Sequence, residues 1–140
     1  MHISIIGQAT TPFGELWDKD ISTLMSDVVH ASLVSSGVDP TDIEAVFVAN
    51  MAGGEFSHQS HLSAIAAGLF PHFPPAMRIE GACASGGLAT LAATQALLSG
   101  QYATVMVIGV EKMTDTSADV ATHILAGAAD TTLESGSTFP

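Results

Sequence analysis

Two short runs of apolar, strand-forming residues contain no alternating polar positions, and they constrain the fold more than any other feature. Residues 45–49 are Ala-Val-Phe-Val-Ala, and residues 103–110 hold a dense group of Val, Met and Ile. A strand with one face in water alternates apolar and polar residues, whereas an unalternating strand suits a parallel sheet covered on both faces by helices. The two runs therefore predict a parallel sheet that is covered on both faces by helices.

Segments of strand type alternate with segments of helix type along most of the chain. From Ile21, apolar residues recur every three or four positions, and Gly37 provides a typical helix end. The alternation predicts an α/β layered fold, with one mainly parallel sheet, helices on both faces and right-handed crossovers. We expect strands over residues 2–9, 43–49, 76–80 and 103–110, helices over 21–36, 59–69 and 84–98, and a Gly-rich loop over 51–57.

The composition changes after Met113. Residues 114–140 are rich in Thr, Ala, Ser, Asp and Gly, contain no Lys or Arg, and show little periodicity. We expect a loop or the start of another subdomain there, with a helical turn at 123–126.

The charge balance excludes one class of partner. Three Lys and Arg residues stand against fourteen Asp and Glu, for a formal net charge of -11. Nucleic-acid binding needs clustered cations to neutralise phosphates, so we predict no nucleic-acid partner. A solvated acidic surface is the default interpretation, and an acidic patch for a basic partner is the alternative.

Residues 81–110 contain no charged side chain, which raises the question of a membrane span. The polar turn at 99–101 divides the stretch, and its first half consists mainly of small residues, so two buried elements explain it better. The N-terminus lacks a basic region and a long apolar region, so no signal peptide is expected. With a single cysteine, which excludes an internal disulfide, the sequence predicts a cytoplasmic protein without a membrane partner.

That cysteine, Cys83, lies where an extended segment ends and a helix of small residues begins. Free N–H groups and the positive end of the helix dipole favour an anion at such a place, and a thiolate attacks carbonyl carbon. The same N–H groups can stabilise an oxyanion, while Gly81, Gly86 and Gly87 leave room for a substrate. A buried, inert cysteine is the alternative, and position alone leaves both open.

The histidines give no comparable signal. His58 and His61 are three residues apart near a helix start and could present two imidazoles on one face. No third ligand follows at a metal-binding spacing, so we predict no metal site. The other four histidines are scattered, and none stands out as a base for Cys83.

The segment Gly81–Ala89, preceded by a strand and followed by residues 103–113 (Ala-Thr-Val-Met-Val-Ile-Gly-Val-Glu-Lys-Met), resembles the thiolase family. The likeness is greatest to the sterol-carrier-protein type and its bacterial and archaeal relatives, and includes acetyl-CoA acetyltransferases. The opening Ile-Ile-Gly and the run 46–50 fit the same pattern, so the resemblance covers essentially the whole chain. The Ala-Ser-Gly-Gly that follows Cys83 is its most specific part.

The resemblance implies acyl transfer between CoA thioesters. Cys83 would be the nucleophile that carries the acyl group as a thioester, and its backbone N–H would help to form the oxyanion hole. Acetyl-CoA condensation and 3-ketoacyl-CoA thiolysis are the two directions of this chemistry. The implied ligands are acyl-CoA and CoA as substrates, with no permanently bound cofactor and no metal.

The resemblance also implies an incomplete, N-terminal half of the thiolase fold. Residues 1–113 match the α/β domain that carries Cys83, and residues 114–140 match the start of a loop domain. A later Asn motif, the Gly-His-Pro histidine, a second cysteine and the last strand of this half would all lie elsewhere. We therefore expect a C-terminal half or partner subunit, and a homo- or hetero-oligomer. No residue of 114–140 is basic, so contacts to the CoA phosphates would also come from elsewhere.

Two alternatives remain open at this stage. One is a non-catalytic assembly module that keeps the fold and binds another thiolase-like chain. The small residues of helix 84–98 suit close packing on all sides, so we expect an apolar face that is exposed or covered by another chain. The other is a different condensing enzyme, such as a ketoacyl synthase or hydroxymethylglutaryl-CoA synthase, because a shared fold does not settle function.

Overall fold

The computed structural model describes residues 2–134, and its centre is a sheet of three parallel strands. The middle strand β1 (Ala45–Ala49) lies between β2 (Ala76–Ile79) and β3 (Val105–Gly109). The strands predicted over 43–49, 76–80 and 103–110 are confirmed, apart from their end residues.

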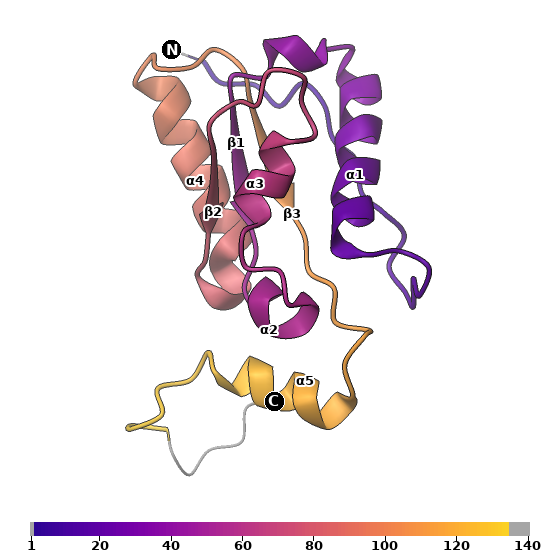
Figure 1. The fold of residues 1–140 in the computed structure, drawn as a ribbon. Helices are drawn as coiled ribbons and strands as arrows, with labels where there is room; N and C mark the ends of the chain where they lie inside the picture. Colours follow the sequence, from indigo (N-terminus) through magenta and orange to yellow (C-terminus); the bar gives the residue numbers. More distant parts are fainter. Residues whose placement is uncertain (1, 135–140) are drawn as a thin grey trace.

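Helices cover both faces of this sheet (Figure 1). Helix α4 (Ser85–Leu98) packs on one face, and α1 (Ile21–Ser36) and α3 (Leu62–Ala67) pack on the other. Alternate side chains of β1 point to the two faces: Phe47 packs with the α4 alanines, and Val48 with α1 and α3. Because both faces are covered, all five residues of β1 are buried, which is why the strand has no polar positions. The predicted α/β layered fold is confirmed.

Local signals define the ends of α1. The Asp20 carboxylate accepts a hydrogen bond from the Thr23 N–H at 2.7 Å, as expected of a residue that caps a helix start. At the other end, Gly37 has φ +68 and donates its N–H to the Leu33 carbonyl. A left-handed residue is the common way to end a helix, and glycine adopts it without strain. The predicted helix over 21–36 is confirmed; the apolar periodicity and Gly37 predicted it, and the Asp20 cap explains why it begins at Ile21.

The strand predicted over residues 2–9 is wrong for the described part of the chain. These residues pair with no strand, and the hydrogen bonds of their backbone join Gln8 to the Ser35 hydroxyl. Residues 3–9 and β3 both line a groove of about 320 Å³. The segment forms no backbone hydrogen bonds to β3, so it lacks the paired neighbour that a strand requires.

The predicted loop over residues 51–57 is also wrong in part, because α2 (Gly53–Ser57) forms there. One nearby and one distant side chain hold the backbone at the start of this short helix. The Asn50 amide oxygen accepts from the Gly53 N–H at 2.9 Å, and the Glu111 carboxylate accepts from the Met51 N–H at 2.9 Å. The following helix, predicted over 59–69, is the shorter α3.

Helix α5 (Ala118–Ala126) exceeds the predicted helical turn at 123–126. The Ser117 hydroxyl accepts from the Val120 N–H at 3.4 Å, and α5 packs against α2 below the sheet (Figure 1). The remainder of the predicted loop domain, residues 135–140, lies outside the described residues. Among the helices of residues 2–134, none combines the length and apolar character needed to cross a membrane.

Candidate active site

Cys83 lies in a 3₁₀ turn, Ala82–Ala84, between the end of β2 and the start of α4. Its side chain is exposed, so the thiol is not buried within the described residues. The turn belongs to the carboxyl edge of the parallel sheet, where α/β proteins gather their ligands.

Side-chain hydrogen bonds hold the turn in an unusual conformation. Ala82 has φ +49, in the left-handed region that residues with a Cβ seldom adopt. The Glu80 carboxylate accepts from the Ala82 N–H at 2.6 Å. The buried Ser85 hydroxyl accepts from the Gly81 N–H at 2.9 Å and donates to the Ala82 carbonyl at 2.7 Å. A Cβ at Gly81 would collide with the end of the Leu88 side chain, so that side chain would have to move.

The surroundings of Cys83 are open on the outer side of α4. A Cβ at Gly86 or Gly87 would meet no other atom within 4 Å. Beyond these glycines, the exposed face of α4 carries Leu88, Leu91 and Leu98, while Ser85, Ala89 and Ala93 are buried. The exposed apolar face expected for helix 84–98 is therefore present.

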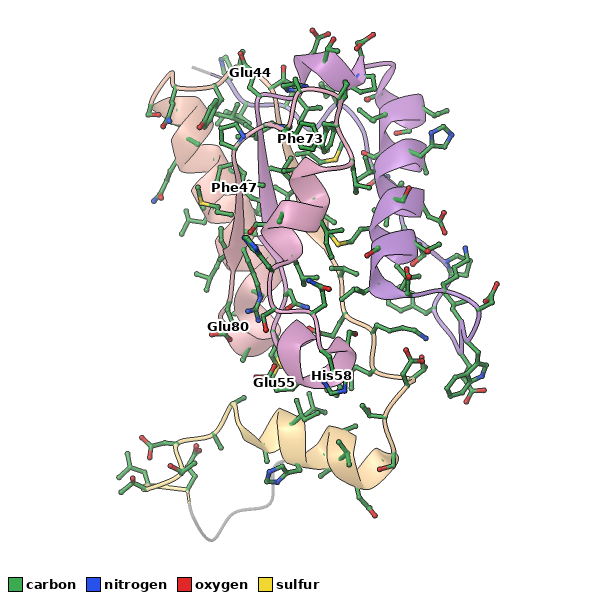
Figure 2. The ribbon with its side chains drawn as sticks, viewed as in Figure 1. Glu44, Phe47, Glu55, His58, Phe73 and Glu80 are labelled. Carbon is green, nitrogen blue, oxygen red and sulfur yellow. The ribbon has the colours of Figure 1, made fainter. Side chains whose placement is uncertain are left out.

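Three polar residues join the carboxyl ends of the strands, and we call them the strand-end network: Asn50, Arg78 and Glu111. Asn50 donates to a Glu111 carboxylate oxygen at 2.9 Å and accepts from Arg78 Nε at 3.0 Å. Arg78 Nη2 also donates to the Met51 carbonyl at 2.6 Å. Figure 2 shows Glu80 at this end of the sheet and Glu44 at the opposite end.

The sequence analysis did not identify this network as a unit. A signal was present, because Asn50 and Glu111 each follow an unalternating apolar strand. Polar residues at the carboxyl ends of neighbouring parallel strands share one edge of the sheet. The adjacency of β1 and β3, which the sequence did not show, brings the two side chains together.

Lys112 is a second residue that sequence reasoning missed. It is only 4% exposed, and its ammonium group donates to the Leu16 carbonyl at 3.0 Å and to Thr114 Oγ1 at 2.5 Å. Its ion pair with Asp115 measures 3.0 Å, and the Trp17 ring lies 5.7 Å away. These contacts compensate the buried charge and tie the segment after β3 to the segment before α1.

The histidines form no metal site within residues 2–134, where no group of three or more His, Cys, Asp or Glu is arranged to hold an ion. His58 follows the end of α2, His61 precedes α3, and both are exposed. His72 Nε2 lies 2.9 Å from the Ile43 carbonyl, which gives that ring a structural role.

Comparison with known proteins gives a consistent result. A family model described as the N-terminal domain of thiolase matches residues 3–137. The chain is 37% identical to an acetyl-CoA acetyltransferase of Methanothermobacter thermautotrophicus and 39% identical to one of Methanocaldococcus jannaschii, in each case over 99% of the chain and 36% of the relative. An acetyl-CoA acetyltransferase of Cupriavidus necator is 33% identical over 74% of the chain and 25% of its own length. The chain thus spans about a third of the length of the first two relatives.

Proposed function

This chain belongs to the thiolase family, and from that premise we propose that it supplies the nucleophile for acyl transfer between CoA thioesters. Cys83 is the proposed nucleophile. The observation that carries the proposal is the exposed thiol at the start of α4, beside the carboxyl ends of the parallel strands. Three relatives named acetyl-CoA acetyltransferase support acetyl-CoA as a substrate.

In the proposed first step, the Cys83 thiolate attacks the carbonyl carbon of an acyl-CoA. The new S–C bond forms as the bond from carbon to the CoA sulfur breaks, so the products are acyl-Cys83 and CoA thiolate. In the second step, a base from the C-terminal half removes a proton from the α-carbon of another acyl-CoA. The resulting enolate attacks the acyl carbon, the bond to the Cys83 sulfur breaks, and the products are a 3-ketoacyl-CoA and the Cys83 thiolate. Thiolysis is the same sequence in reverse, with Cys83 cleaving the 3-ketoacyl-CoA and CoA removing the acyl group.

The start of α4 supplies electrostatic stabilisation for the attack of Cys83 on the thioester. The helix dipole places partial positive charge at the N-terminus of α4, which favours the oxyanion of the tetrahedral intermediate formed at Cys83. We assign the backbone N–H of Cys83 to the oxyanion hole by analogy with the family. The open space over Gly86 and Gly87 gives the thioester access to the sulfur.

We propose that the remaining catalytic groups come from a C-terminal half, either in a longer polypeptide or in a partner subunit. The chain covers 36% of the length of two relatives, which leaves ample sequence for such a half. Native intact mass of the protein from its source, with all denatured chains identified, tests this. A heavier chain that begins with this sequence, or a complex with a second thiolase-like chain, supports the proposal. This chain alone, or only with copies of itself, contradicts it.

Acyl-enzyme formation tests the role of Cys83 directly. We expect acetyl-CoA or acetoacetyl-CoA to acetylate the native protein, and peptide mass spectrometry to locate the acetyl group on Cys83. Neutral hydroxylamine should remove it, since it cleaves thioesters readily. Cys83→Ala is the control and should take up no acetyl group at the corresponding peptide. Acetylation elsewhere, with none on Cys83, would exclude the proposed mechanism.

The exposed outer face of α4 favours a second candidate, an assembly module for another thiolase-like chain. Leu88, Leu91 and Leu98 on this face are 41%, 52% and 53% exposed. Cys83→Ser discriminates between the candidates, because assembly should survive the change and acyl transfer should not. Retained activity of the assembled complex with Cys83→Ser would favour the module.

A further inference from the structure

Asn50 is held in one orientation by four hydrogen bonds. The residue is 2% exposed. Its Nδ2 donates to the Val110 carbonyl at 2.8 Å and to Glu111 Oε1 at 2.9 Å. Its Oδ1 accepts from the Gly53 N–H at 2.9 Å and from Arg78 Nε at 3.0 Å. A side-chain amide has two N–H donors and an oxygen with two lone pairs, so its hydrogen-bonding capacity is fully used.

Glu111 is the ionised acceptor among the groups that fix the orientation of this amide. A carboxylate only accepts, so together with the Val110 carbonyl it keeps the NH₂ group of Asn50 on its side and the amide oxygen toward Arg78. The same carboxylate accepts from the Met51 N–H at 2.9 Å, while Arg78 donates to the Met51 carbonyl at 2.6 Å. The anionic Glu111 thus binds the N–H of Met51, and the cationic Arg78 binds its carbonyl, just after β1. Hydrogen bonds that involve an ionised partner are the stronger class.

The chain between Arg78 and Cys83 has little freedom. The Ile79 carbonyl accepts from the Asn50 N–H at 3.3 Å. The Ser85 hydroxyl accepts from the Gly81 N–H, the Glu80 carboxylate accepts from the Ala82 N–H, and Ala82 keeps its positive φ. Backbone of this kind persists only where its surroundings over-determine it. The position of Arg78 is therefore transmitted to the turn that carries Cys83.

We propose that Glu111 is a positioning residue for Cys83 and acts through Asn50 and Arg78 on the turn that holds the thiol. The inference rests on the proposed function, since it concerns the placement of the proposed nucleophile. None of the three residues needs to contact the substrate. Their role is to hold the sulfur in line with the carboxyl ends of the strands.

A purely structural role of Glu111 is the competing explanation, and the chain offers a matched control. Glu44 also accepts from two backbone N–H groups, those of Ala103 and Thr104, but at the opposite end of the sheet (Figure 2). Glu111 uses both of its oxygens, Oε1 for Asn50 and Oε2 for the Met51 and Ala52 N–H groups, so Glu111→Gln turns an NH₂ group toward a donor and loses contacts. A single oxygen of Glu44 accepts from both of its partners, so Glu44→Gln removes the charge beside two paired N–H groups. Only the change at Glu111 lies on the route to Cys83.

The experiment compares Glu111→Gln, Arg78→Lys and Glu44→Gln in the native protein with all its chains present. Misplacement of a reacting group by about 1 Å can cost 10²-fold in rate. We therefore expect Glu111→Gln and Arg78→Lys to lower the rate constant for Cys83 acetylation by about 10- to 100-fold, with KM for the thioester unchanged. Glu44→Gln should keep the wild-type rate constant, even where urea unfolding shows an equal loss of stability.

A second measurement does not depend on activity. Labelling with bromotrifluoroacetone places a ¹⁹F probe on Cys83, the only cysteine of this chain. Resonances from cysteines outside this chain are those that remain in Cys83→Ala. The ¹⁹F chemical shift at Cys83 should change in Glu111→Gln and Arg78→Lys and stay constant in Glu44→Gln.

The outcomes separate the two proposals. A loss of acetylation and a changed ¹⁹F shift in the two network variants alone support positioning. Equal effects in all three variants, or no effect in Glu111→Gln, overturn the positioning role of Glu111. A wild-type acetylation rate and ¹⁹F shift in Arg78→Lys overturn the route through Arg78. If the wild-type protein never acetylates Cys83, the proposed function fails, and the ¹⁹F shifts by themselves decide the role of Glu111.

Discussion

Residues 2–9 and strand β1 are alike in sequence and opposite in structure. Both are rich in β-branched residues and carry no acidic or basic side chain other than His2. In β1, Phe47 is 2% exposed and Val48 is fully buried, whereas Ile5 is 89% exposed and Ile6 is 58% exposed. Both segments therefore have a strand propensity, and propensity does not account for the difference in their exposure.

The difference lies in the neighbours that each segment meets. β1 has hydrogen-bonded partners along both edges and helices on both faces. Residues 3–9 line a groove together with β3 and pair with no strand in the described part of the chain. Strand preference largely measures how well side chains fit a paired, half-buried surface, so a segment without that surface does not become a strand.

The largest contrast should appear in amide hydrogen exchange. The Phe47 and Val48 amides lie in the central strand and should exchange only on global unfolding, which costs about 5–15 kcal/mol in typical domains. The Ile5 and Ile6 amides should exchange close to the rate of an unstructured peptide. Hydrogen exchange monitored by NMR or mass spectrometry checks this prediction. Similar protection of both segments would show that residues 2–9 are as stably structured as β1.

Truncation of core side chains should give the next largest difference. Phe47 packs against α4, so Phe47→Ala should lower the free energy of unfolding by about 3–5 kcal/mol. The exposed Ile5 offers a matched change, and Ile5→Ala should stay within about 0.5 kcal/mol of wild type. Urea unfolding of both variants measures the difference. An equal cost at the two positions would mean that residues 3–9 are packed as tightly as the sheet.

A smaller effect should appear in acid. The Glu44 carboxylate, immediately before β1, accepts from the Ala103 and Thr104 N–H groups, and these hydrogen bonds lower its pKa below the ordinary value. A lowered pKa in the folded state stabilises the fold above the ordinary pKa, and that stabilisation disappears as the pH falls through the folded value. Wild type should thus exceed Glu44→Gln in stability at neutral pH, and the gap should narrow in acid.

Urea unfolding of wild type and Glu44→Gln across the acidic range measures this gap. A gap that does not change with pH would show that the Glu44 charge plays no part in joining β1 to β3. Residues 2–9 contain no carboxylate that could make such a link, which sharpens the contrast with β1.

Much of the candidate site could be predicted from the sequence because its signals are local. Cys83, its flanking glycines and the helix that follows form one continuous segment, so their order predicts a thiol at a helix start. The exposure of that thiol, the positive φ of Ala82 and the role of Ser85 depend on three-dimensional contacts. No sequence pattern predicted these three features.

The sequence by itself determined where α1 begins and ends, which runs form β1, β2 and β3, and where the cysteine lies. These features follow from side-chain periodicity, capping residues and backbone preferences that act over a few residues. Tertiary structure decided that residues 2–9 remain unpaired, that α2 begins where a loop was expected, and that Asn50, Arg78 and Glu111 meet. Each depends on which strands become neighbours, because a strand needs a partner edge and a hydrogen bond needs both of its groups in place.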